Sequence, residues 1–78
     1  MPTVLRVGRY RFFFFSNEGE EPAHVHVRRG GGVAKIWLQP VRLAYSEGLN
    51  PAELRRVREL ATQHQAAFLE RWHEHLGR

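Results

Sequence analysis

The segment EPAHVHV, residues 21–27, places His24 and His26 two positions apart. If this segment is a β-strand, both imidazoles point to one face while Val25 and Val27 point to the other, because side chains alternate along a strand. A neutral histidine can remove the proton of a ribose 2′-hydroxyl or protonate a leaving oxygen near neutral pH. The pair therefore predicts an acid–base centre on one face of a sheet.

Cations and an aromatic ring share the predicted histidine face. Arg28 continues the same strand on that face, and Lys35 and Trp37 lie on it in the following strand. Cations interleaved with an aromatic ring can hold phosphates and stack a base, which is the composition of an RNA-binding surface. The residues that we expect to contact nucleic acid are Arg11, Arg28, Arg29, Lys35 and Trp37.

The histidine pair also has two simpler interpretations. An antiparallel sheet commonly shows one polar face to water, in which case the pair has no chemical role. Neutral histidines are common metal ligands as well, but a metal site needs a third and usually a fourth ligand. We therefore expect neither a bound metal nor a cofactor.

His64 interrupts the apolar stripe of a predicted C-terminal helix, where it shares a face with Val57 and Phe68. A buried imidazole needs a hydrogen-bond partner, so a structural role is the simpler interpretation. The alternative is a catalytic role shared with His24 and His26. Because the strand histidines face away from the helix, His64 could join them only at a sheet edge or a bulge. His64 is thus the third candidate catalytic residue.

Two predicted hairpins position the strand residues. Residues 3–7 and 10–16 are rich in β-branched and aromatic side chains, which predicts a first hairpin. Residues 23–28 and 33–38 alternate around a turn formed by the glycines at 30–32, which predicts a second hairpin. The buried side chains of the second hairpin should lie under the helix.

A single long helix is predicted after these strands. The polar, acidic residues 17–22 should form an exposed loop, and residues 41–48 an irregular crossover. Asn50 is a favourable N-cap and Glu53 completes a capping box, so a helix should begin there and run to about Leu76. The predicted fold is an α+β domain in which two antiparallel β-hairpins form a sheet covered by one long C-terminal α-helix.

The length and composition indicate a small single domain, residues 1–78, without cysteine. Packing or a partner must then stabilise the chain in place of disulfides, which makes a protein complex or a homo-oligomer an expectation. No apolar run approaches the roughly 20 residues that span a bilayer, and none has signal-peptide character. We therefore expect a cytoplasmic protein with no membrane contact.

The positive charge of the chain is concentrated in its first half. The formal net charge is +4, and residues 1–45 carry all of it, because cations and glutamates balance in residues 46–78. Such a field attracts polyanions such as nucleic acid, or an acidic partner. The basic excess therefore lies on the predicted sheet.

Several segments resemble a family of small bacterial and archaeal proteins known as domain of unknown function 4160. The resemblance is carried by residues 10–16, 21–27 and 34–36, and by His64 and Trp72. It implies a component of two-gene operons of toxin–antitoxin type, with a small protein from the same operon as the cognate partner. It implies no established catalytic mechanism, but it singles out the two strand histidines, His64 and Trp72 as the positions to test first.

Two functional hypotheses follow. The first is a toxin–antitoxin-type module whose basic sheet face binds RNA, with metal-independent, ribonuclease-like cleavage by His24 and His26 as an extension of that hypothesis. The alternative is a non-enzymatic partner-binding protein, an antitoxin or a regulator, in which the histidines are structural. Growth arrest on expression, relieved by co-expression of a neighbouring gene, would separate the two.

Overall fold

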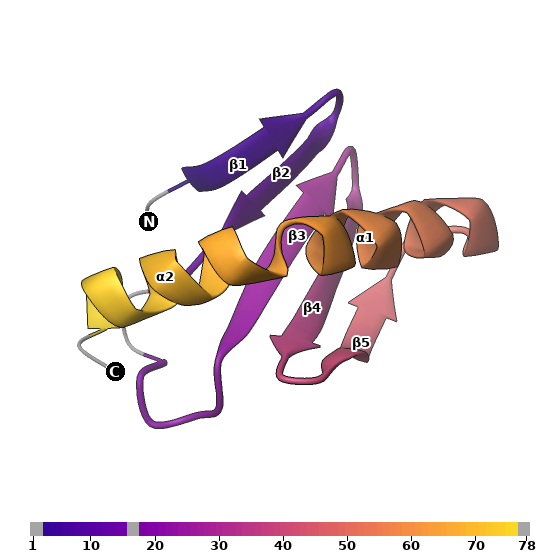
Figure 1. The fold of residues 1–78 in the computed structure, drawn as a ribbon. Helices are drawn as coiled ribbons and strands as arrows, with labels where there is room; N and C mark the ends of the chain where they lie inside the picture. The colour runs from indigo at the N-terminus through magenta and orange to yellow at the C-terminus, as the bar shows by residue number, and fades with distance from the viewer. Residues whose placement is uncertain (1–2, 16–17, 77–78) are drawn as a thin grey trace.

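The structure is a computed structural model that describes residues 3–15 and 18–76. Its elements, in chain order, are β1 (Thr3–Val7), β2 (Tyr10–Phe13), β3 (His24–Arg29), β4 (Gly32–Leu38), β5 (Val41–Glu47), α1 (Pro51–Gln63) and α2 (Gln65–Leu76). The five strands form one sheet in the order β1-β2-β3-β4-β5, and every neighbouring pair is antiparallel. Both helices lie across the same face of this sheet (Figure 1). The predicted α+β class is confirmed.

Both predicted hairpins are present, but the sheet has a fifth strand that we did not predict. Residues 41–48 were expected to form a crossover, whereas β5 pairs with β4 from Leu38↔Val41 to Val33↔Glu47. Val41 and Leu43 are spaced by two, which is the period of a strand, and a register shift between Lys35 and Ile36 then turns Tyr45 to the opposite face. The prediction of a sheet made of two hairpins alone was therefore wrong.

The prediction of one continuous helix was also wrong, because the helix is interrupted at His64. This residue has φ −107° and ψ 16° and lies between α1 and α2. Backbone hydrogen bonding continues across it, from His64 N–H to the Leu60 carbonyl and from Phe68 N–H to the His64 carbonyl. The Gln65 side chain donates to the Leu38 carbonyl at 2.5 Å, which ties the first residue of α2 to the end of β4.

The start of α1 matches the predicted capping box. The Asn50 side chain accepts a hydrogen bond from the Glu53 N–H at 2.8 Å, and the Glu53 carboxylate accepts one from the Asn50 N–H at 2.8 Å. These two bonds satisfy backbone donors that a helix N-terminus otherwise leaves unpaired.

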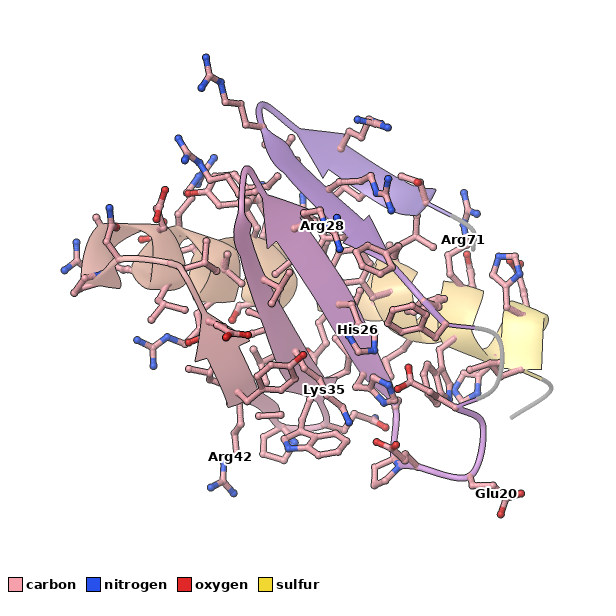
Figure 2. All side chains as sticks on the ribbon, turned by 180° about the vertical axis from the view of Figure 1, so that it is seen from behind. Glu20, His26, Arg28, Lys35, Arg42 and Arg71 are labelled. Atoms are coloured by element: carbon pink, nitrogen blue, oxygen red, sulfur yellow. The ribbon has the colours of Figure 1, made fainter. Side chains whose placement is uncertain are left out.

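The core lies between the sheet and the helices. Its fully buried members are Phe12, Phe14, Val25, Val27, Ala34, Ile36, Leu38, Val57, Leu60, Ala61, Phe68 and Trp72. The set includes Val25, Val27, Ile36 and Leu38, the side chains of the second hairpin that should lie under the helix. The opposite face of the sheet is not covered by the helices, and His26, Arg28, Lys35 and Arg42 project from that side (Figure 2). Neither α1 nor α2 is long and apolar enough to cross a membrane.

Candidate functional site

The strand histidines lie at the start of β3, at the point where the neighbouring strand β2 has ended. Phe13, the last residue of β2, pairs with His26, so His24 lies beyond the end of β2. Phe14 turns into the core there and packs edge-on against Trp72 of α2, with ring centroids 5.6 Å apart. The start of β3 is thus a place where a strand, a helix and the β2–β3 connection meet.

Both histidines are buried, which contradicts the expectation that they face solvent. The exposed fraction is 0% for His24 and 8% for His26. The His24 ring lies between Trp72 and Trp37, with centroid distances of 4.8 and 5.5 Å, and the His26 ring contacts Phe15 at 4.5 Å. Strand alternation places them on the uncovered face correctly, but aromatic side chains and the β2–β3 connection then cover that part of the face.

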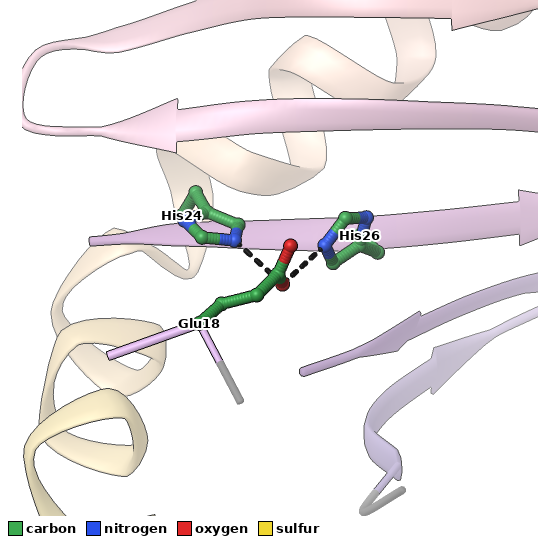
Figure 3. Close-up of side chains that lie close together, drawn as sticks. All are labelled: Glu18, His24 and His26. Carbon is green, nitrogen blue, oxygen red and sulfur yellow. Dashed lines mark hydrogen bonds and ion pairs between the residues drawn. The ribbon is translucent and has the colours of Figure 1, made fainter. Parts of the chain in front are cut away.

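Glu18 of the β2–β3 connection joins the two histidines (Figure 3). One oxygen, Oε1, lies 2.8 Å from His24 Nε2 and 2.7 Å from His26 Nε2. The other nitrogen of His24, Nδ1, lies 2.9 Å from the Pro22 carbonyl oxygen. Because both of these oxygens can only accept, His24 makes its two hydrogen bonds only when both ring nitrogens carry a proton.

The pKa values of Glu18 and His26 are both lowered, but for different reasons. Burial raises the pKa of the Glu18 carboxyl, but hydrogen bonds from His24 and His26 outweigh it and leave that pKa below its ordinary value. Burial lowers the pKa of His26, and the hydrogen bond to Glu18 offsets this only in part. The cluster is therefore an ionised carboxylate that accepts one hydrogen bond from a neutral imidazole, His26, and another from His24.

The cluster has the composition of a metal-ligand set. Glu18, His24 and His26 offer one carboxylate oxygen and two imidazole nitrogens, all within 4.8 Å of one another. Two histidines and one carboxylate are ligands of catalytic zinc and of non-haem iron sites. Glu18 is not among the site residues predicted from the sequence. The sequence does place this acidic residue six positions before His24. Residue spacing cannot show, however, that an irregular connection folds back to bring it to the histidines.

Two of the residues predicted to contact nucleic acid, Arg29 and Lys35, form ion pairs with glutamates. Arg29 points to the helix-covered face, where its Nη1 donates to Glu53 at 2.5 Å. Lys35 lies on the uncovered face, where its Nζ donates to Glu21 at 2.6 Å and sits 4.7 Å from the centroid of Trp37. The structure therefore does not bring Arg29 together with the other predicted contacts.

A row of three arginines crosses the uncovered face. Arg6 of β1 pairs with Arg11 of β2, and Arg11 pairs with Arg28 of β3. Directly opposite residues on antiparallel strands point to the same face, and like charges in this position destabilise the sheet. Arg6 and Arg28 are exposed, while Arg11 is half-buried with its Cζ 4.8 Å from the Phe13 centroid. Arg6 is not among the contacts predicted from the sequence, because residue spacing does not reveal strand register.

Within the described part of the chain, these three arginines have no carboxylate partner. Among residues 3–15 and 18–76, none of the three forms an ion pair, and Arg11 Nε is buried without a hydrogen-bond partner. Most buried polar atoms in proteins have a partner. Arg29 Nε is buried without a partner as well, although Nη1 of that guanidinium donates to Glu53.

His64, the third predicted catalytic residue, lies apart from the histidine cluster. Its ring is half-buried at the junction of α1 and α2, and its ring contact within the described part of the chain is with Phe68, 6.0 Å away. Trp72, further along α2, contacts His24 instead. The structure thus brings together Glu18, His24, His26 and Trp72, and leaves His64 outside.

The fold and the site define a small α+β protein with a carboxylate–histidine cluster beside a basic sheet face. The chain belongs to the family described as Domain of unknown function (DUF4160), whose model matches residues 10–73. This range includes the whole cluster and two of the three arginines of the row. No curated protein and no solved structure matches the chain.

Proposed function

We propose that this protein binds single-stranded RNA through the uncovered face of its sheet, as the RNA-binding component of a cytoplasmic toxin–antitoxin-type module. The observation that carries this proposal is the cross-strand row of Arg6, Arg11 and Arg28. Adjacent strands lie about 4.8 Å apart, so the three arginines start from backbone positions within about 10 Å of one another. A chain of phosphates across this row would relieve the repulsion among the arginines and supply an acceptor for Arg11 Nε.

An exposed aromatic ring supports RNA as the polyanion. Tyr45 is 51% exposed and pairs with Lys35 across β4 and β5, so it projects from the same face as the arginine row. Bases of a single strand stack on such rings with little dependence on sequence. Trp37, the ring that the sequence analysis favoured, already packs against Lys35 and His24. Tyr45 is therefore the better stacking platform.

Burial of the histidines favours binding over cleavage by these residues. A general acid or base must come within hydrogen-bond reach of the reacting proton. His24 has an exposed fraction of 0%, and Oε1 of Glu18 occupies the Nε2 side of both imidazoles. We therefore keep RNA binding as the proposed function and assign no cleavage step to His24 and His26.

A salt titration of RNA binding tests this proposal. Labelled single-stranded RNA should bind the purified protein, and its affinity should fall steeply as salt increases, because contacts with phosphates release condensed cations. Arg28→Ala should weaken binding and reduce the salt slope by about 0.7, the value for one phosphate contact on a single strand.

The matched control is Arg55→Ala, which removes the same charge from an exposed position on α1. This variant should bind RNA with the wild-type salt slope. An affinity that does not depend on salt, or equal losses for Arg28→Ala and Arg55→Ala, would contradict the proposal. Capture of an acidic protein partner that Arg28→Ala abolishes, without RNA binding, would favour the partner-binding alternative.

A further inference from the structure

We propose that Glu18, His24 and His26 form a binding site for one divalent transition-metal ion, with a coordination position left for water or another ligand. This inference does not depend on RNA binding. It rests on three ligand atoms from two segments that lie within 4.8 Å of one another. Strand alternation aims both imidazoles at the same side of β3, and the β2–β3 connection brings the carboxylate to them.

The surroundings of His24 are those of a metal ligand. Its Nδ1 faces the Pro22 carbonyl oxygen at 2.9 Å, and its Nε2 faces Glu18. Histidines that bind metals almost always donate the second ring N–H to a carbonyl or a carboxylate, which leaves the other nitrogen free to coordinate. Trp72 and Trp37 pack against the ring and hold its orientation. These contacts therefore orient the His24 ring before any metal arrives.

The distances require all three ligands to adjust. Zinc bonds of about 2.0 to 2.2 Å in tetrahedral geometry place neighbouring ligand atoms about 3.4 Å apart. The Glu18 oxygen now lies 2.8 and 2.7 Å from the two Nε2 atoms, because N–H groups rather than a metal separate them. Glu18 belongs to the connection rather than to a strand, so its carboxylate can move outward by about half an ångström. The two imidazole nitrogens, which lie within 4.8 Å of each other, must also turn toward the metal to reach a spacing of about 3.4 Å.

The chemistry of the ligands selects the class of metal. Imidazole nitrogens suit zinc, cobalt, nickel and iron(II), whereas magnesium and calcium prefer oxygen ligands throughout. The cluster has two nitrogens and one carboxylate, and the chain contains no cysteine. Three protein ligands leave a position for an exogenous group, and the exposed fraction of 19% for the Glu18 side chain shows that solvent reaches this side of the cluster.

Calorimetry on the full chain tests the site with the metal alone. After treatment with a chelator, the protein should bind one Zn²⁺ or Co²⁺ per chain and should not bind Mg²⁺. Because outer-shell partners alone are worth about 10- to 100-fold in affinity, loss of a direct ligand in His26→Gln or Glu18→Gln should weaken Zn²⁺ binding more than about 100-fold. Glu18→Gln retains a carbonyl oxygen that accepts N–H donors, so it keeps the hydrogen-bonded fold.

His73→Gln is the matched control. His73 and His75 have the same spacing as the strand pair but are exposed on α2, where residues two apart do not face each other. This variant should bind Zn²⁺ with wild-type affinity. Wild-type affinity in Glu18→Gln, or the same loss in His73→Gln as in His26→Gln, would overturn the proposal.

A measurement on the wild-type chain keeps the test independent of variant folding. In ¹⁵N NMR spectra of the imidazoles, Zn²⁺ should shift the Nε2 resonances of His24 and His26 and leave those of His73 and His75 unchanged. Absence of saturable Zn²⁺ binding, or shifts confined to His73 and His75, would show that the strand cluster is a hydrogen-bonded structural unit and not a metal site.

Discussion

The indole of Trp72 packs against the imidazole of His24, with ring centroids 4.8 Å apart. This contact joins α2 to the first residue of β3, and it orients the histidine that donates to Glu18 and faces the Pro22 carbonyl. The carboxylate–histidine cluster is therefore coupled to the packing of the C-terminal helix.

Trp72→Ala should destabilise the protein by about 3 to 5 kcal/mol, because a large buried side chain leaves a cavity that its neighbours fill only in part. Urea unfolding, followed by circular dichroism, measures this change. Arg71→Ala alters an exposed neighbour on the same helix and should stay within about 0.5 kcal/mol of wild type. Equal stabilities of the two variants would show that the α2 contact with His24 contributes little.

The free energy of unfolding should fall as the pH is lowered, in two ranges. Burial lowers the pKa of His26 from 6.5, so below about pH 6.5 the unfolded chain takes up a proton that the native His26 resists. The Glu18 pKa is also below its ordinary value of 4.5, because hydrogen bonds from the histidines outweigh burial. The contribution of the Glu18 carboxylate to the free energy of unfolding is complete above about pH 4.5. It is lost as the pH falls through the pKa of Glu18 in the native protein.

Urea unfolding in the presence of a chelator, repeated across this pH range, measures both contributions. His26→Gln should remove the loss of stability that begins near pH 6.5. Glu18→Gln should reduce the loss at more acidic pH. His73→Gln, which changes an exposed histidine outside the cluster, should retain the loss of stability that begins near pH 6.5. A wild-type profile that is flat from neutral to acidic pH would contradict the assigned pKa directions.

Arg28→Gln should weaken RNA binding and stabilise the free protein. Removal of a positive charge directly opposite Arg11 relieves a cross-strand repulsion worth about 0.2 to 1 kcal/mol. The gain should be largest at low salt, because mobile ions screen exposed charges. Urea unfolding at two salt concentrations measures it. A variant that is less stable than wild type at low salt would show that the three arginines do not oppose one another.

Gln65→Ala should cost more stability than His64→Gln, although the sequence analysis emphasised the histidine. The Gln65 side chain donates to the Leu38 carbonyl, and loss of such a hydrogen bond costs about 0.5 to 1.5 kcal/mol. We had expected His64 to be buried with a hydrogen-bond partner, but its ring is half-buried and packs near Phe68. Melting temperatures of the two variants test which substitution costs more stability. A larger fall for His64→Gln would restore the original expectation.

Local periodicity in the sequence determined which residues share a face. Alternation along residues 24–28 was sufficient to place His24, His26 and Arg28 together, since a strand repeats every two residues. The capping box of Asn50 and Glu53 likewise predicted the start of α1, because both hydrogen bonds lie within one turn. These features depend on neighbours in the chain.

Only the tertiary structure decided what meets those residues in space. The approach of Glu18 to the histidines depends on the path of an irregular connection, which no residue period encodes. The row of Arg6, Arg11 and Arg28 depends on strand register, which hairpin turns and packing across the whole sheet select. Burial of His24 requires α2 to reach the start of β3. Each of these contacts joins separate elements, so their positions follow from how the elements pack and not from the spacing of residues within any one of them.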